Sequence, residues 1–165
     1  MQDTGLSVRL FYMLIYINSK YRNYFLNFFS TDTAAVYGNE RDIGNALIEL
    51  LPKYNLTRKD IYITTKLAPS DQGKDKAKKA VARSLQNLQI SYIDLYLIHW
   101  PGAGNVDVHS EKNKQLRKES WFDLVDLYKE GVLKNIGVSN YTVRHLTELF
   151  ADCKNVRPSV NQVCY

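Results

Sequence analysis

From residue 39 onward, the hydrophobic and polar positions switch between a helical and a strand-like period. The first helical pattern carries apolar residues at offsets of 3, 4, 7 and 8, which line one face of an α-helix. Residues 61–65 form a run of β-branched and aromatic side chains, which predicts a buried strand. The helix face consists of Ile43, Ala46, Leu47, Leu50 and Leu51, with Asn39 as a candidate N-cap and Pro52 and Asn55 at the end.

The same alternation continues along the rest of the chain. Further strands are predicted at residues 94–98, 133–138 and 159–163. Helices are predicted to open at residue 70 or 71, near residue 118 after a Gly-rich loop, and at residue 140 or 142. Their expected inward positions are Ala77, Ala80, Val81, Ser84, Leu85 and Leu88, then Phe122, Val125 and Tyr128, then Val143, Leu146, Leu149 and Phe150. The lysines at 74, 76, 78 and 79 are expected on a solvated helix face.

Strict alternation of helices and strands predicts an α/β fold with parallel strands and right-handed crossovers. An open doubly wound sheet and a (β/α)8 barrel both satisfy this order. The polar residues favour the barrel, because in a barrel the carboxyl ends of all strands open onto one mouth. Neither G-x-G-x-x-G nor G-x-x-x-x-G-K-[ST], the phosphate-binding turns of open sheets, occurs in the sequence. The polar residues at predicted strand ends are Lys66, His99, Ser139, Asn140 and Gln162.

We therefore expect a partial (β/α)8 barrel whose strands curve into an arc. The strand that begins near Leu133 should lie between the strands that end at His99 and Val163, because consecutive β/α units are spatial neighbours. The chemistry-bearing residues should then converge on one face of the arc.

Four ionisable residues near this expected mouth suggest a reaction. A phenol has an ordinary pKa of about 10 and is a poor acid at neutral pH, but a neighbouring ammonium stabilises the phenolate. Tyr37 and Lys66 are such a pair, and the carboxylate of Asp32 would hold the lysine in place. His99 could orient a bound carbonyl by hydrogen bonding. Together these groups could protonate a carbonyl oxygen while hydride arrives at the carbon.

Composition narrows the functional classes. The 165 residues are 45% hydrophobic and 24% charged, which suits one globular domain and excludes disorder, collagen and coiled coil as descriptions of the whole chain. The net charge of +5 suits an anionic ligand such as a phosphorylated cofactor, and it is no nucleic-acid signature. Cys153 and Cys164 form no metal-site pattern, so no metal is expected, and they favour a reducing compartment, the cytoplasm.

Residues 1–31 differ from the rest of the chain. Residues 1–30 hold 8 of the 20 aromatic residues and a single acid, Asp3. Their apolar run, residues 10–17, covers eight residues, whereas a membrane-spanning helix needs about 20. No small-residue cleavage site follows the run, which argues against a signal peptide. No membrane association is therefore expected, and residues 1–31 are treated as an atypical segment before a domain of residues 32–165.

Five ordered motifs resemble the aldo-keto reductase superfamily. They are residues 32–40 (DTAAVYGNE), 63–66 (ITTK), 94–101 (DLYLIHWP), 137–141 (GVSNY) and 161–162 (NQ). The resemblance implies a (β/α)8 barrel that reduces aldehydes and ketones with NADPH. It implies that Tyr37 is the general acid, that Lys66 and Asp32 tune it, and that His99 orients a substrate bordered by Trp100. It further implies that Ser139, Asn140 and Gln162 bind the nicotinamide carboxamide, with Asp32 close to the cofactor.

The length departs from this family pattern. The chain has 165 residues, and a complete barrel of this kind needs at least about 200. We expect the C-terminal strands to be missing, together with the late basic segment that the family uses for the adenosine 2′-phosphate, which leaves the choice of NADP or NAD open. We expect residues 1–31 to derive from non-coding sequence or an alternative exon, because no Gly-rich first strand precedes Asp32.

These departures leave two functional hypotheses. The first is an NADP(H)-dependent oxidoreductase that acts on a small carbonyl compound and is monomeric when complete. The second is a truncated, catalytically inactive fragment with a structural or regulatory role. In a truncated chain, apolar side chains that a full barrel buries would be exposed and would promote association.

Overall fold

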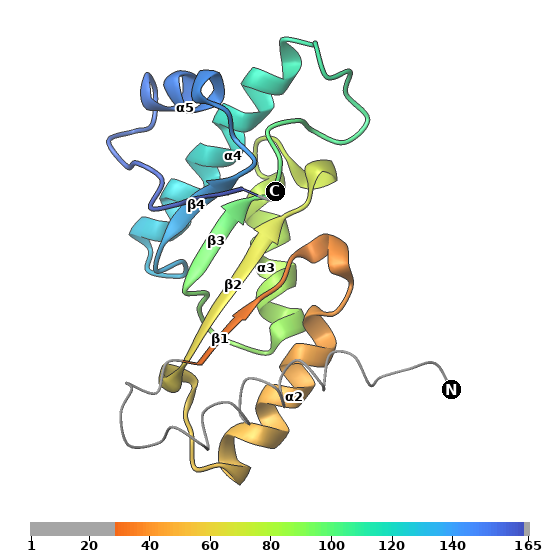
Figure 1. Ribbon diagram of the computed structural model, residues 1–165, viewed down its shortest axis with the longest axis vertical. Helices are drawn as coiled ribbons and strands as arrows, with labels where there is room; N and C mark the ends of the chain where they lie inside the picture. The colour runs from red at the N-terminus through yellow and green to blue at the C-terminus, as the bar shows by residue number, and fades with distance from the viewer. Residues whose placement is uncertain (1–28, 164–165) are drawn as a thin grey trace.

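The computed structural model describes residues 29–163, which form a parallel sheet of five strands in the order β1-β2-β3-β4-β5 (Figure 1). The strands are β1 (Phe29–Asp32), β2 (Ile61–Leu67), β3 (Leu95–Ile98), β4 (Ile136–Ser139) and β5 (Asn161–Gln162). The α-helices between them are α2 (Glu40–Lys53), α3 (Lys76–Leu88), α4 (Lys112–Lys129) and α5 (Val143–Phe150). Every pairing is parallel, and β4 lies between β3 and β5, which confirms the predicted alternation and strand order.

The sheet is curled rather than flat. Asp32 ends β1 and Gln162 ends β5, the two edge strands, yet Gln162 Nε2 donates a hydrogen bond of 2.5 Å to Asp32 Oδ2. A flat sheet of five strands would separate these ends by four inter-strand spacings of about 4.8 Å. The carboxyl ends of the edge strands therefore bend toward each other, and the described residues form the predicted arc of a barrel.

A first strand is present, although the sequence shows no Gly-rich strand before Asp32. Phe29–Thr31 pair with Ile61–Ile63 of β2 in parallel register, so Asp32 is carried by a regular strand. The sequence signal was weak because this strand is short and its four residues alternate between half-buried and exposed positions. The expectations for residues 1–28 lie outside the described residues.

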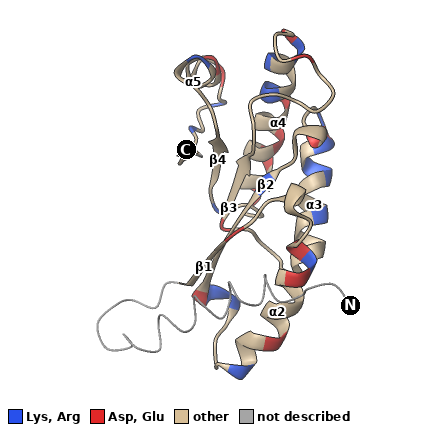
Figure 2. Cartoon of the chain, turned by 45° about the vertical axis from the view of Figure 1, so that its right-hand side comes forward, with Lys and Arg blue, Asp and Glu red and all other residues tan. Residues whose placement is uncertain are grey.

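Helices α2, α3 and α4 cover one face of the sheet, and the helix boundaries differ from the predictions in two places. Figure 2 shows α2, α3 and α4 on the same side of the strands. Helix α3 begins at Lys76 rather than residue 70 or 71, because Gly73 and Asp75 have positive φ angles of 122° and 60°. Helix α4 begins at Lys112 rather than near residue 118, so the preceding loop is shorter than expected.

The core lies between the sheet and these helices. Its largest fully buried side chains include Trp121 and Leu124 of α4, which pack with Tyr96 and Ile98 of β3. Tyr128, predicted to face inward, is 40% exposed, because the inward face of α4 runs through Trp121, Leu124 and Val125. Val143 and Phe150 of α5 are likewise exposed. The lysines at 74, 76 and 79 are exposed as predicted, whereas Lys78 is partly buried and pairs with Asp126 of α4.

Gly137 lets the chain close tightly beside β4. A Cβ atom at this position would lie 2.7 Å from the carbonyl oxygen of Val160 and 2.9 Å from Leu97 Cδ2. The absence of a side chain therefore allows the segment before β5 to approach β4, and it places Gln162 next to Ser139 in the register of the sheet. Within residues 29–163, no helix is both long and apolar enough to cross a membrane.

Candidate active site

The residues predicted to be catalytic lie together at the carboxyl ends of the strands. Asp32 is the last residue of β1, Lys66 is the penultimate residue of β2, and His99 directly follows β3. Tyr37 ends a short 3₁₀ turn, Ala35–Tyr37, and the next residue, Gly38, closes this turn with a φ of 69°. Because all strands are parallel, these ends share one rim, which is where parallel α/β folds place their ligands.

The Lys66 ammonium is buried between two oxygen acceptors and one aromatic ring. Lys66 is 3% exposed, and its Nζ donates hydrogen bonds to Asp32 Oδ1 and, at 2.9 Å, to the carbonyl oxygen of Thr33. The same nitrogen lies 5.5 Å from the centroid of the Tyr37 ring. The Asp32 side chain keeps 46% of its surface exposed and can retain part of its hydration. The predicted placement of the ammonium between Asp32 and Tyr37 is confirmed.

Tyr37 and His99 are in ring contact. Their centroids are 5.8 Å apart with an interplanar angle of 84°, an edge-to-face arrangement. Tyr37 is 54% exposed, while His99 is only 6% exposed. Among the described residues, the Tyr37 hydroxyl makes no hydrogen bond, and His99 Nδ1 is buried without a partner. Both polar groups therefore remain available to a ligand at the rim.

The environment of His99 favours its neutral form. Burial lowers the pKa of the imidazole, the positive charge of Lys66 lowers it further, and the carboxylate of Asp32 opposes this shift. A neutral imidazole can donate or accept a hydrogen bond at neutral pH without supplying a proton. This favours an orienting function for His99 over a function as the acid.

Ser139, Asn140 and Gln162 form a second group on the same rim. Ser139 Oγ donates to the carbonyl oxygen of Gln162 at 2.8 Å and accepts from Asn140 Nδ2 at 3.0 Å. Gln162 Nε2 reaches Asp32, which links this group to the Lys66 ion pair. Gln162 Oε1 is buried and has no hydrogen-bond partner in the described part of the chain. An amide N–H2 donor of a ligand would satisfy this acceptor.

Trp100 borders the site from the loop after β3. Its ring stacks on that of His99 with centroids 6.2 Å apart and planes at 27°, and 48% of the residue is exposed. Trp100 therefore presents a large apolar surface beside His99, at the position where the family resemblance implies contact with the substrate.

Two buried residues near the rim were missed by sequence reasoning. Glu40, at the start of α2, is 4% exposed and accepts a hydrogen bond of 2.8 Å from Thr65 Oγ1, next to Lys66. Gln72, between β2 and α3, is 2% exposed and contacts the loop after β3. Glu40 follows Tyr37 within one motif, which was a usable signal, whereas Gln72 sits in a polar loop with no sequence feature of its own.

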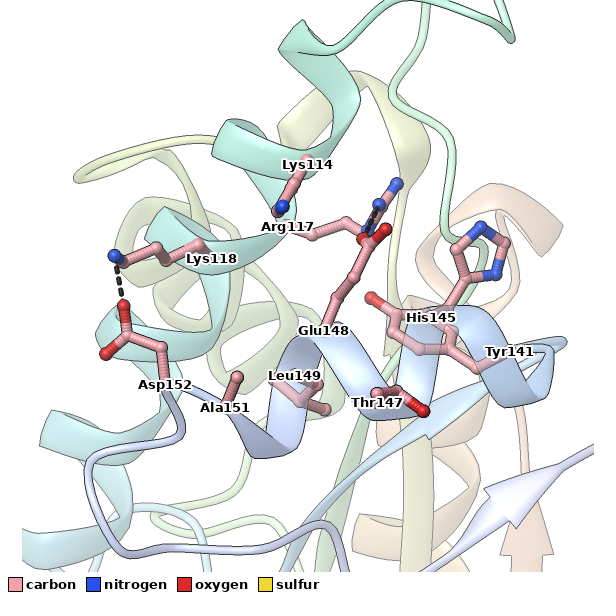
Figure 3. Close-up of a pocket in the computed structure, with 10 residues that line it drawn as sticks. All are labelled: Lys114, Arg117, Lys118, Tyr141, His145, Thr147, Glu148, Leu149, Ala151 and Asp152. Carbon is pink, nitrogen blue, oxygen red and sulfur yellow. Dashed lines mark hydrogen bonds and ion pairs between the residues drawn. The ribbon is translucent and has the colours of Figure 1, made fainter.

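A separate cavity lies between α4 and α5, away from the predicted catalytic residues (Figure 3). Its volume is about 520 Å³, and none of Asp32, Tyr37, Lys66 or His99 lines it. Arg117 Nη2 pairs with Glu148 Oε2 at 2.7 Å across it, and Lys118 pairs with Asp152. The Tyr141 hydroxyl is buried beside it without a hydrogen-bond partner among the described residues. Burial raises the pKa of this phenol, so it stays protonated.

Comparisons with known proteins agree with the geometry. The family model for the aldo/keto reductase family matches residues 20–165. Glyoxal reductase of Bacillus subtilis is 42% identical over 134 residues, which are 81% of this chain and 43% of that protein. The 9,11-endoperoxide prostaglandin H2 reductase of Trypanosoma cruzi is 44% identical over 132 residues, which are 80% of this chain and 41% of that protein.

Solved structures extend the match to the fold. An aldo/keto reductase from Brucella melitensis superposes with a TM-score of 0.71 at 40% identity, covering 82% of this chain and 48% of that one. A Bombyx mori aldo-keto reductase in complex with NADP gives a TM-score of 0.71 at 32% identity, covering 82% of this chain and 43% of that one. The chain thus spans less than half the length of these relatives. With a family model matching residues 20–165 and a barrel arc shared with solved members, this chain belongs to the aldo/keto reductase family.

Proposed function

We propose that the chain carries the catalytic and nicotinamide-binding residues of an NADPH-dependent reductase that converts a small aldehyde or ketone to an alcohol. The observation that carries this proposal is the arrangement around Lys66, whose buried ammonium lies between the Asp32 carboxylate and the Tyr37 ring. This is the charge distribution that favours proton transfer from a phenol at the moment a carbonyl oxygen becomes negative.

Each residue at the rim has a distinct proposed role. Tyr37 donates the proton from its half-exposed hydroxyl, and the Lys66 ammonium stabilises the negative charge left on the phenol oxygen. Asp32 fixes the ammonium through an ion pair, and the Thr33 carbonyl gives it a second hydrogen bond. His99, held neutral by burial and by Lys66, orients the substrate carbonyl next to Tyr37.

The residues present fit a nicotinamide carboxamide. The buried, unpartnered Gln162 Oε1 is an acceptor for the amide N–H2, and Ser139 and Asn140 lie beside it in one hydrogen-bonded group. When bound, the reduced nicotinamide supplies hydride to the carbonyl carbon. Asp32 borders both groups, because one carboxylate oxygen faces Lys66 and the other accepts from Gln162. The preference for the phosphorylated cofactor is inferred from relatives, one of which was solved in complex with NADP.

Small reactive aldehydes are the first substrates to test. Similar proteins are named glyoxal reductase and methylglyoxal reductase, at 42% and 39% identity. A compact, partly aromatic rim formed by Tyr37, His99 and Trp100 suits such a substrate.

The test compares Tyr37→Phe with wild type and with a control, Tyr54→Phe. Tyr54 is also exposed, at 41%, but it lies at the end of α2, away from the rim. Turnover is followed as loss of NADPH absorbance with glyoxal or methylglyoxal, and cofactor binding as a change in NADPH fluorescence. We expect Tyr37→Phe to lower kcat by about 10²–10⁴-fold, the usual worth of a general acid, with cofactor affinity retained. Tyr54→Phe should match wild type.

Retention of more than about a hundredth of the wild-type kcat in Tyr37→Phe would overturn the assignment of the acid. A wild-type chain that melts cooperatively but neither binds NADPH nor reduces any aldehyde would support the alternative of a non-catalytic barrel fragment.

A further inference from the structure

The loop after β3 is held by side chains from three other segments. Four consecutive carbonyl oxygens, those of residues 99–102, each accept a hydrogen bond from a side-chain nitrogen. Asn140 Nδ2 donates to residue 99 at 3.1 Å, and Arg117 Nη1 donates to residue 101 at 2.9 Å. Gln72 Nε2 donates to two of the four, residue 100 at 2.8 Å and residue 102 at 3.0 Å. Such a run of side-chain donors fixes a segment that has no regular secondary structure of its own.

Gln72 is the most buried of these donors. It is 2% exposed, and both of its partners are carbonyl oxygens, which only accept hydrogen bonds, so the amide nitrogen must face the loop. The other amide atom, Oε1, is consequently buried without a hydrogen-bond partner within residues 29–163. Leaving a buried acceptor unpaired is unfavourable. A side chain kept in this orientation indicates that the two bonds to the loop outweigh the unpaired oxygen.

The held loop carries the residues that border the substrate. Trp100 is half exposed and stacks on His99, so its indole has little packing of its own against the core and follows its backbone. The Gln72 bond to the Trp100 carbonyl therefore fixes where the indole stands relative to His99 and Tyr37. Gln72 itself comes from the segment after β2, the strand that carries Lys66, so it ties the Trp100 loop to the strand that bears the ammonium.

We propose that Gln72 is a positioning residue that sets the substrate-facing wall formed by His99 and Trp100, and that it thereby determines affinity for the carbonyl substrate. Gln72 acts through the backbone carbonyls of residues 100 and 102 and does not touch the substrate. The inference rests on the proposed reductase function for its kinetic consequence, but the placement of Trp100 can be measured without turnover.

The test uses Gln72→Leu in the full chain, with Gln86→Leu as the control. Gln86 is an exposed glutamine of α3, so its substitution makes the same chemical change away from the loop. Acrylamide quenching of tryptophan fluorescence reports Trp100, because the other tryptophan, Trp121, is 0% exposed. Gln72→Leu should increase the quenching constant. It should also raise KM for the aldehyde by about 5- to 30-fold, the factor expected for two hydrogen bonds, with kcat and NADPH affinity changed far less.

Gln72→Glu is the second variant, because it keeps the side-chain shape and removes the donor. The same increase in quenching and KM in both Gln72 variants, with Gln86→Leu unchanged, supports the proposal. The proposal is overturned if quenching and KM are unchanged in a folded Gln72 variant. It is also overturned if kcat and NADPH affinity fall by the same factor as the affinity for the aldehyde, because that would indicate a general structural defect. If wild type shows no turnover, the proposed function fails while the quenching comparison still decides whether Gln72 holds Trp100.

Discussion

Replacing Lys66 by Met tests separately how much the Lys66 ammonium contributes to the free energy of unfolding and how much it contributes to carbonyl reduction. The substitution removes one buried ammonium and its hydrogen bonds to Asp32 and to the Thr33 carbonyl oxygen. Methionine has a similar length and a flexible apolar side chain, so it fills the same space without a cavity. Asp32 loses its ion-pair partner, but 46% of its side chain is exposed and the carboxylate can be rehydrated.

The expected loss of stability is modest. A hydrogen bond to a charged group contributes about 1.5–3 kcal/mol, and an unpaired buried carbonyl costs about 1–3 kcal/mol. Against this, the variant no longer has to desolvate an ammonium that is 3% exposed, a penalty of several kcal/mol in a protein interior. The balance predicts a net destabilisation of about 1–3 kcal/mol. The activity should fall by at least about 10²-fold, because the charge that stabilises the phenolate is gone.

Urea unfolding followed by far-UV circular dichroism measures the first quantity, and NADPH-dependent reduction of glyoxal measures the second. Lys79→Met is the matched control, because Lys79 is an exposed residue of α3 and is not one of the residues of the rim. Its stability should stay within about 0.5 kcal/mol of wild type, and its activity should be unchanged.

Two results would refute the reasoning about Lys66. If Lys66→Met kept most of the wild-type kcat, the ammonium would have no part in proton transfer. If Lys66→Met lowered the free energy of unfolding by more than about 4 kcal/mol, a loss typical of severe core damage, the main contribution of the ion pair would be to stability.

Three further outcomes are expected. In NMR titrations the pKa of His99 should lie below its ordinary value and rise in Lys66→Met, because one of the two causes of the lowered pKa is removed; an identical titration in both proteins would contradict the placement of the charge. Because the pKa of His99 is lowered in the folded state, the contribution of His99 to stability is present above the ordinary pKa of about 6.5 and is lost as the pH falls below that value. The urea midpoint of wild type should therefore decrease more steeply than that of His99→Gln as the pH falls below about 6.5. Gly137→Ala should destabilise by about 1–3 kcal/mol in urea, because its Cβ would lie 2.7 Å from the Val160 carbonyl oxygen; a neutral result would mean that the β5 segment can move away.

The fold could be predicted from the sequence where periodicity and burial agree. The helix over Glu40–Lys53 buries Ile43, Leu47 and Leu50 of its predicted face and half-buries Ala46 and Leu51. The strand over Ile61–Leu67 is buried at all positions but one, as its β-branched and aromatic run indicated. Parallel order then followed from the alternation alone, because parallel strands need crossover connections. The same logic brought Lys66 and His99 to one rim, since both lie at carboxyl ends.

The errors arose where tertiary contacts override local pattern. Ser70 and Asp71 before α3 are typical N-cap residues, but the Gly73 amide donates to Ser120 Oγ of α4 at 2.9 Å, and the regular helix begins only at Lys76. The first turns of α4 are too polar to show a stripe, so its start at Lys112 left no hydrophobic signal. Gln72 was missed for a similar reason, because its importance lies in carbonyl groups 28 and 30 positions away in the chain.

The polar groups at the two ends of the sheet have different surroundings. At the amino end, Asp94 accepts from Arg58 at 2.5 Å and from the Ile63 amide at 2.9 Å, while Arg58 also donates to the carbonyls of residues 61 and 92. Those charges are engaged by neighbouring strands and loops and stabilise the bottom of the arc. At the carboxyl end, His99 Nδ1 and Gln162 Oε1 are buried without partners among the described residues. Arg58 Nε at the amino end is also buried without a partner among these residues. His99 and Gln162 differ from Arg58 in lying on the rim that carries Lys66, where a bound molecule could pair with their unpartnered atoms.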